Sequence, residues 1–259
     1  MAQLLGVDSL ADVGTALTLS GAHAFVLKQG EGEAGVSVRA DDVLELSDQT
    51  TGLVDVNEAD TVVGSLDQMV SLRGQDVGNQ VAFADSVSVV VINVGDVRAD
   101  SLSDLSLHIT GTVYATGAQT VSGSLEALLA VSGDTVGGTG DADGVVLLQT
   151  VTYALDAKDD LSVLADSLSA LSGRTGGVVD ASAADTVRGT VGALLALAAD
   201  SVGTGDTDGG VVLKPAVTVQ VLLPADGAMP EGAVAAQALL DVDAVGAFGR
   251  VDARAGTTI

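Results

Sequence analysis

Residues 176–213 read GGVVDASAADTVRGTVGALLALAADSVGTGDTDGGVVL. The pattern predicts a strand, a helix, an acidic glycine turn and a second strand. Apolar residues recur at helical spacing and predict a helix over 187–199 that buries one face. Asp185 and Thr186 precede this helix and are expected to supply its N-cap oxygens. The apolar positions of the helix are Val187, Val191, Leu194, Leu195 and Ala198.

The same unit occurs elsewhere in the chain. Residues 55–72 and 114–131 repeat it closely, and residues 153–171 form a weaker copy. The copies therefore predict two further helices, over 62–72 and 121–131. The residues on which the four copies align are Thr61, Thr120, Asp160 and Thr186.

The repeats predict an α/β fold of irregular strand–helix–strand units, stacked as a solenoid-like array with strand-rich insertions. One unit alone cannot bury its apolar helix face, whereas stacked units can. Unequal spacing between the copies indicates a degenerate array. The expected segments are a strand-rich N-terminal segment (1–50), a first unit with a β insertion (51–113), second and third units (114–178), a fourth unit (179–223), and a C-terminal helix with the start of a further unit (224–259).

Several short apolar runs outside these helices predict strands. Residues 24–27 and 36–38 are expected to be strands joined across a turn, and residues 43–46 are a candidate third strand. The nearly continuous run over 89–94 is typical of a strand covered on both faces. Residues 102–109 are expected to continue the β character.

Composition and charge exclude several classes of protein. The formal net charge is −25, and most of the 35 acidic residues are Asp. No basic patch exists to neutralise phosphates, so we expect no nucleic-acid partner. The chain has no Cys, which excludes disulfides and thiolate chemistry. No apolar stretch is long enough for a transmembrane segment, and the N-terminus lacks the features of a classical signal peptide, so any export would use another route.

Two acidic turns are the strongest candidate metal sites. GTGDADG (138–144) and GTGDTDG (203–209) both follow a predicted helix, and each offers two Asp one residue apart, then Gly. Carboxylates at alternate positions can converge on one Ca²⁺, and Gly permits a sharp turn that adds carbonyl ligands. No Glu falls at the twelfth position, which excludes an EF-hand. A solvated turn inherited by duplication is the alternative. The expected calcium ligands are Asp141, Asp143, Asp206 and Asp208.

No catalytic constellation is visible, and we expect no enzyme. Asp60–Thr61 and Asp185–Thr186 are explained by helix capping. Asp159–Asp160 could form a carboxylate pair, but it also opens a predicted helix, where acidic groups favour the helix dipole. The two histidines, His23 and His108, are too few and too scattered for a triad.

The helical unit resembles a repeat of large secreted bacterial surface proteins, namely S-layer proteins and adhesins exported by type I secretion. That resemblance implies an extracellular, calcium-dependent protein that assembles with itself at the cell surface. The matching residues are Asp60, Thr61, Leu66 and Met69; Thr120, Leu125 and Leu128; and Asp185, Thr186, Val191, Leu194 and Leu197.

The sequence therefore favours a structural protein that forms a surface layer or filament, as a homo-oligomer or polymer joined through exposed strand edges. An adhesin or carbohydrate-binding module is the alternative, although Tyr114 and Tyr153 are the only tyrosines available for stacking on a sugar. An acidic hydrolase ranks below both. An acidic cytoplasmic protein of a salt-loving organism would also fit the low Lys and high Asp content.

Overall fold

The fold is taken from a computed structural model, which describes residues 24–26, 36–77, 80–84, 86–109, 111–133, 144–157, 161–201, 209–215, 217–222 and 250–252. The chain divides into two compact units. Unit 1 comprises residues 1–94, 101–117 and 135–146, and unit 2 comprises residues 95–100, 118–134 and 147–259. Each unit is described by itself.

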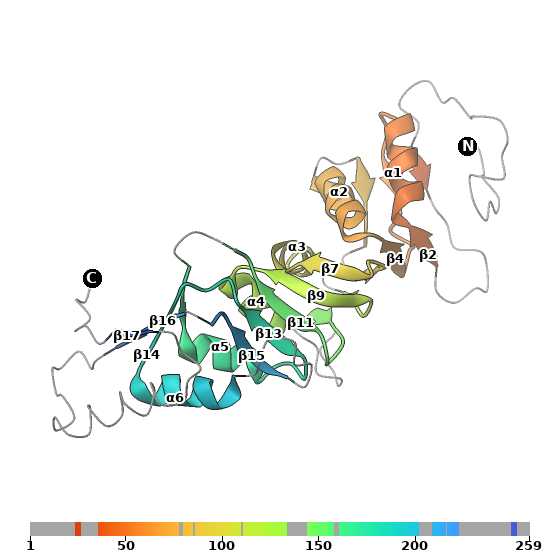
Figure 1. Ribbon diagram of the computed structural model, residues 1–259. Helices are drawn as coiled ribbons and strands as arrows, with labels where there is room; N and C mark the ends of the chain where they lie inside the picture. Colours follow the sequence, from red (N-terminus) through yellow and green to blue (C-terminus); the bar gives the residue numbers. More distant parts are fainter. Residues whose placement is uncertain are drawn as a thin grey trace. The chain divides into compact units, whose positions relative to one another are not determined.

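Unit 1 alternates short strands with helices (Figure 1). The division falls within helix α3, because residues 99–100 belong to unit 2 and residues 101–106 belong to unit 1. The elements are β1 (Phe25–Val26), β2 (Ser37–Arg39), α1 (Ala40–Gln49), β3 (Val54–Asp55), β4 (Thr61–Gly64), α2 (Leu66–Val77), β5 (Val81–Ala82), β6 (Ser88–Val91), α3 (Ala99–Ser106), β8 (Thr112–Tyr114) and β10 (Gly144–Val146).

Unit 2 follows the same alternation, and α5 contacts strands of both of its sheets. Helices α4 and α6 each contact α5. The elements are β7 (Gly95–Arg98), β9 (Ala118–Gly123), α4 (Leu125–Gly133), β11 (Thr152–Leu155), β12 (Ser162–Leu164), α5 (Ala165–Ser172), β13 (Val178–Ala181), β14 (Thr186–Gly189), α6 (Val191–Asp200), β15 (Gly210–Leu213), β16 (Thr218–Val221) and β17 (Arg250–Asp252).

Every named strand pairs in parallel with another strand, and most pairs join strands that are second neighbours along the chain. Unit 1 holds the sheets β1-β3-β5 and β10-β8-β6-β4-β2, and unit 2 holds β15-β13-β11-β9-β7 and β12-β14-β16-β17. Strands β9, β11, β13 and β15 can be followed side by side in Figure 1. The α/β class with parallel strands and alternating strands and helices is confirmed.

The cores are built from apolar side chains at matched register positions. In unit 1, Val62, Val89, Val113 and Val145 are aligned on four adjacent strands, and each is at most 2% exposed. In unit 2, the aligned and buried residues are Val97, Val121, Tyr153, Val179 and Val211 in one sheet, and Val163, Val187 and Val219 in the other. Burying each Val side chain stabilises the fold by roughly 1.5–3 kcal/mol. The two-residue alternation of buried positions therefore fixes the register between strands.

Small residues meet where strands join helices. The last residue of β4, Gly64, faces the first residue of α1, Ala40, so closely that a Cβ on the glycine would lie 2.5 Å from the alanine Cβ. Gly123 and Gly189 face Ala99 and Ala165 in the same way, at 2.9 and 3.0 Å. Each contact links the Ala that opens one helix to the Gly that ends the strand before the next helix.

The helices predicted over 62–72, 121–131 and 187–199 are partly confirmed. Their later residues form α2, α4 and α6, but their first three residues are the ends of β4, β9 and β14. The predicted capping role of Asp185 and Thr186 is therefore wrong. Thr190 caps α6, because its Oγ1 accepts a hydrogen bond from the Ala193 N–H at 3.2 Å.

Three strand predictions in the first half of the chain are wrong. Residues 43–46 lie in α1, and residues 102–106 lie in α3. Strands β1 and β2 form as expected, but they are not joined to each other, since β1 pairs with β3 and β2 with β4. In the weaker copy over 153–171, the helix is limited to α5, because residues 152–155 and 162–164 are strands. Among the described residues, no helix has the length and apolarity to cross a membrane.

Candidate functional site

The predicted calcium ligands Asp141, Asp143, Asp206 and Asp208 lie outside the described residues, as do Asp159 and Asp160. Within the ranges that the structure describes, no three His, Asp or Glu side chains gather in a way that could hold a metal ion. The calcium prediction therefore stays a prediction.

Asp60 and Asp185 tie neighbouring strands together. The Asp60 Oδ2 accepts a hydrogen bond from the Val36 N–H at 2.9 Å, and the Asp185 Oδ2 accepts one from the Leu161 N–H at 3.1 Å. The backbone N–H of each Asp donates in return to the carbonyl of the same partner, at 2.9 and 2.8 Å. Each Asp thus satisfies both backbone groups of the residue before an adjacent strand.

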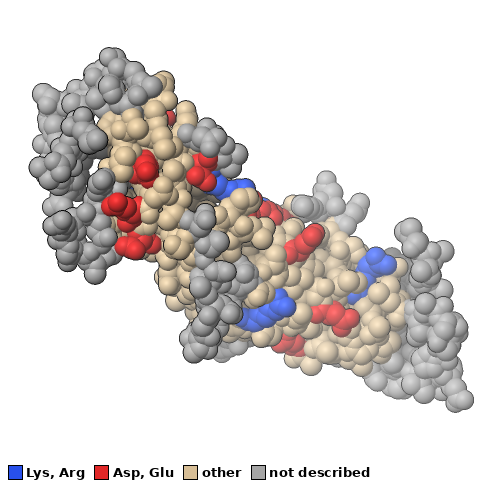
Figure 2. Space-filling view, turned by 180° about the vertical axis from the view of Figure 1, so that it is seen from behind, with Lys and Arg blue, Asp and Glu red and all other residues tan. Residues whose placement is uncertain are grey.

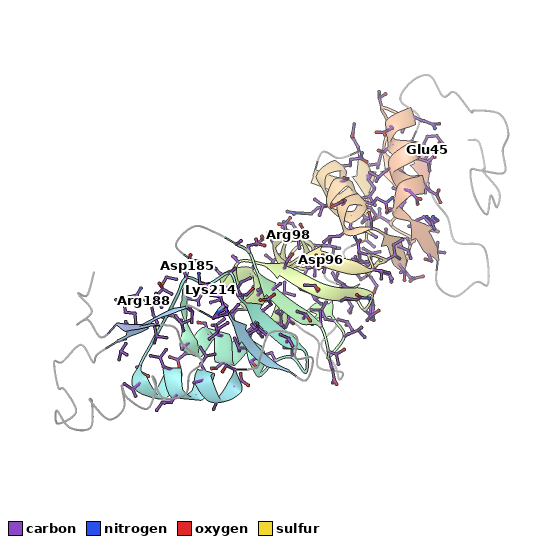
Figure 3. All side chains as sticks on the ribbon, in the orientation of Figure 1. Glu45, Asp96, Arg98, Asp185, Arg188 and Lys214 are labelled. Atoms are coloured by element: carbon purple, nitrogen blue, oxygen red, sulfur yellow. The ribbon has the colours of Figure 1, made fainter. Side chains whose placement is uncertain are left out.

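Asp185 carries a second contact, an ion pair with Lys214, and the two side chains lie next to each other in Figure 3. A carboxylate that accepts from a backbone N–H and a lysine is held in one orientation. These two Asp residues therefore act on strand pairing.

A cavity of about 110 Å³ lies within unit 1. It is bounded by α2, by the chain between β5 and β6, and by the end of α3 with residues 108 and 109 after it. Most of the lining is apolar, and Phe83 is one of only three Phe in the chain. The lining residues are Val62, Met69, Leu72, Arg73, Asp76, Phe83, Ala84, Val87, Val89, Leu105, His108 and Ile109.

Arg73 connects α2 to the end of α3 beside this cavity. It forms an ion pair with Asp104, and its Nη2 lies 2.8 Å from the His108 Nε2. The His108 Nδ1 lies 2.8 Å from the Asp104 backbone carbonyl oxygen. Because a carbonyl can only accept, we assign the proton of the neutral ring to Nδ1, and Nε2 then accepts from Arg73.

The Nε of Arg73 is the unusual atom of this cluster. It is buried and has no hydrogen-bond partner, although the side chain as a whole is 24% exposed. A buried donor without a partner costs roughly 1–3 kcal/mol.

The described lining holds no Ser, Thr or Lys that could act as a nucleophile. The Nε2 of His108 already accepts from Arg73, so it is not oriented as a base toward the cavity. The sequence analysis found the histidines too few and too scattered for a triad. It missed the cluster because Arg73 lies on α2, whereas Asp104 lies on α3 and His108 in the turn after it. His23, the other histidine, lies outside the described residues.

On the face shown in Figure 2, acidic side chains are spread among the described residues, with fewer basic ones between them. The basic side chains are largely engaged. Arg98 contacts Asp156 through both terminal nitrogens, at 2.7 and 2.6 Å, and these contacts raise its pKa above the ordinary value. Arg174 donates to the Leu129 carbonyl and to the Ser132 Oγ, at 3.0 and 3.1 Å, and so joins α4 to the end of α5.

No protein-family model, no curated protein and no solved structure matches this chain.

Proposed function

We propose that the chain is a structural, non-catalytic protein of the cell surface that assembles into a layer or filament. Its units would stack as a solenoid-like array and continue from one molecule to the next. The observation that carries this proposal is the strand pairing: most strands bond in parallel to second neighbours, with the same core residue type at the same register position. Because each further strand could pair in the same way, nothing in this pattern limits the number of strands.

Strand edges are the expected contact surface. In the described part of the chain, β2 and β10 stand at the two ends of one five-stranded sheet, and β7 and β15 at the ends of the other. An edge strand offers backbone N–H and C=O groups to another chain. Addition of a strand in parallel joins two different surfaces, head to tail, and such a contact propagates as an open polymer unless the rotation between copies closes a ring.

Calcium would stabilise the assembly by neutralising acidic surfaces. A net charge of −25 opposes close approach of two copies. A divalent cation held by Asp141 and Asp143, or by Asp206 and Asp208, would reduce that repulsion and order the two glycine turns. The resemblance to secreted surface repeats supports the same reading and an extracellular location.

Negative-stain microscopy and light scattering of the purified chain test this function. We expect polymers in millimolar calcium and monomers in excess chelator, with magnesium at equal concentration as the ionic-strength control. Monomers under every condition would contradict assembly. Polymers that persist in chelator would contradict the calcium role alone.

A quadruple variant tests whether calcium binds at the two acidic turns. Changing Asp141, Asp143, Asp206 and Asp208 to Asn is expected to abolish the calcium response. The matched control removes four negative charges elsewhere, from exposed helical acids, and should keep the response: Asp48→Asn, Asp67→Asn, Asp166→Asn and Glu126→Gln. An equal effect in both variants would show that net charge, not the turns, governs assembly.

A further inference from the structure

We infer that residues 16–18 of one molecule add as a strand to the open edge of β17 in a neighbouring copy. This inference rests on the assembly proposed above and names the contact that would propagate it. It is carried by the common strand order of the sheets, which leaves one place beside β17 without a described strand.

The two five-stranded sheets share one order of elements along the chain. We number the strands of a sheet from first to fifth as they occur in the sequence. A helix follows the first strand and another follows the second: α1 and α2 after β2 and β4, and α3 and α4 after β7 and β9. The third strand is followed by the first strand of the next sheet, and the fourth by its second, as β6 and β8 are followed by β7 and β9. A sheet of this repeat is therefore complete with five strands.

Sheet β12-β14-β16-β17 keeps this order but holds only four strands among the described residues. Helices α5 and α6 follow β12 and β14, as in the complete sheets. Its fourth strand, β17, has Val251 opposite Val219 of β16, just as β8 has Val113 opposite Val89 of β6. In both complete sheets a fifth strand pairs in parallel with the fourth. The edge of β17 therefore offers the backbone groups that a fifth strand would bind.

Fifth strands occupy a fixed place in the sequence. Strands β10 and β15 are directly followed by the third strand of the next sheet, and β5 precedes β6 in the same way. Their central residues are at most 1% exposed, and each precedes the central residue of the following strand by eight positions. The pairs are Val81 and Val89, Val145 and Tyr153, and Val211 and Val219. A fifth strand can thus be located from the third strand that follows it.

The same spacing assigns residues 16–18 as a fifth strand. Strand β1 is the third strand of sheet β1-β3-β5, because Phe25 is aligned through Val54 with Val81 of the fifth strand. Eight positions before Phe25 is Leu17, an apolar residue like the other central ones. Residues 16–18 lie outside the described residues, and no described sheet lies before β1-β3-β5 in the chain to receive them.

A second copy of the chain is the occupant that this order favours. Residues 16–18 would supply the fifth strand beside β17, with Leu17 next to Val251 in the register that sets Val145 next to Val113. Extended segments bind sheet edges in this way, through main-chain hydrogen bonds and alternate side chains. Because the segment and the edge are different surfaces of one molecule, the contact can repeat from copy to copy. The two complete sheets already hold their fifth strands, so we do not assign the contact to their edges.

Disulfide trapping between two variants tests the contact, because the chain has no Cys of its own. The substitutions Thr18→Cys and Asp252→Cys lie opposite each other in the assigned register. Aligned residues of adjacent strands lie about 4.8 Å apart, which is within the Cα separation that a disulfide spans. Mild oxidation of the mixed variants in millimolar calcium should give a covalent dimer with one chain of each kind, linked between positions 18 and 252. Either variant alone should give at least about tenfold less dimer, because its thiols are not held within bonding distance.

Matched controls separate this edge from others and from general effects of charge. Ser37 is an exposed residue of β2, at the edge of a complete sheet, and Ser37→Cys mixed with Asp252→Cys should give no more dimer than Asp252→Cys alone. Leu17→Asp sets a carboxylate at the central position and should abolish the polymers seen by light scattering. Leu107→Asp makes the same change at a leucine that is 80% exposed, and should leave the polymers intact. Circular dichroism checks that both variants keep the fold of the wild type.

The outcomes distinguish this contact from the assembly itself. Polymers without a link between positions 18 and 252, or polymers that survive Leu17→Asp, would overturn the contact and leave the assembly standing. A link formed within single molecules of the double variant Thr18→Cys/Asp252→Cys would show that the segment completes its own sheet, and would overturn the contact as well. Monomers under every condition, with no covalent dimer, would contradict both the contact and the assembly.

Discussion

Gly64 packs so closely against Ala40 that no space remains for a side chain at this position. A Cβ at this position would lie 2.5 Å from the Ala40 Cβ, so the β4 strand or the start of α1 would have to move. We expect Gly64→Ala to lower the free energy of unfolding by about 1–3 kcal/mol, as overpacked cores do. Urea denaturation followed by circular dichroism measures the change.

The chain offers a matched control and a rescue for this substitution. Gly74 lies within α2 with nothing within 4 Å of an added Cβ, so Gly74→Ala should stabilise the helix by up to about 1 kcal/mol. Adding Ala40→Gly to Gly64→Ala should recover part of the loss, since it removes the opposing methyl group. A double-mutant cycle with no coupling between the two sites would contradict the contact.

Asp42 predicts a pH dependence of stability. Burial, and then the charge of Asp41, raise the pKa of Asp42 above its ordinary value of 3.8. Between the ordinary and the raised pKa, the folded chain holds a proton that the unfolded chain has released, so the free energy of unfolding falls as pH rises through this window. Asp42→Asn should therefore be more stable than the wild type at pH 7, by less than about 1 kcal/mol, and equal to it near pH 3.

Asp41 is the control of opposite sign. The Arg39 guanidinium, which donates to Asp41 at 3.0 and 2.9 Å, holds the pKa of that carboxyl below 3.8. Its contribution to stability is present above pH 3.8 and is lost as pH falls through the lowered pKa. Asp41→Asn should thus lose stability at pH 7. The same sign for both variants would show that general charge repulsion, not the local partners, determines the effect.

Helix capping is the property to test at the scale of one element. Thr190 caps α6, whereas Thr186 lies in β14, four residues earlier. Thr190→Val removes the accepting Oγ1 and should destabilise the chain by about 1 kcal/mol. Thr186→Val keeps a β-branched residue in a strand and should change stability by less than about 0.5 kcal/mol. Thermal denaturation compares the two, and a larger loss for Thr186→Val would contradict the cap.

The helices of the chain differ in how well the sequence predicts them. Helices α4 and α6 are rich in Leu and Ala, and the helical spacing of Leu128, Leu194 and Leu197 identifies them. Helices α1 and α3 contain Ser and Asp and bury only three residues each. Such helices form because Ala40 and Ala99 pack at strand ends, and this contact between distant segments has no local signal. The cap was predicted at Asp185 and Thr186, five and four positions before Thr190, because Thr-Val-x-Gly fits a helix start as well as a strand.

The pairing order of the strands is a property of the whole molecule that local patterns do not contain. Alternation of Val predicts strands. However, an extra strand before α3 and another before α5 change which sheet the following strands join. Short apolar runs do not show where these two extra strands lie. The cavity depends on the same placement, because it joins side chains of α2 and α3. The sequence shows that Arg73, His108 and Phe83 are present, but not that they line the same cavity.

Hydrogen exchange measured by mass spectrometry tests the parallel sheets as cooperative ladders. Each inner strand has two neighbours, so its amides should exchange more slowly than those of the outer strands. In unit 2 we expect β11 to be the most protected strand of its sheet, and β7 and β15 the least, by at least about tenfold. Faster exchange in β11 than in β15 would contradict this order.

The contact of Ala with Gly at the strand–helix junctions restricts how a gene for such a chain can change in length. Recombination that deletes or duplicates an even number of helices keeps every opening alanine opposite a glycine. Deletion or duplication of an odd number of helices would place two alanines opposite each other, or would place two glycines opposite each other with a gap between them. Natural variants of this chain should therefore differ in length by pairs of helices.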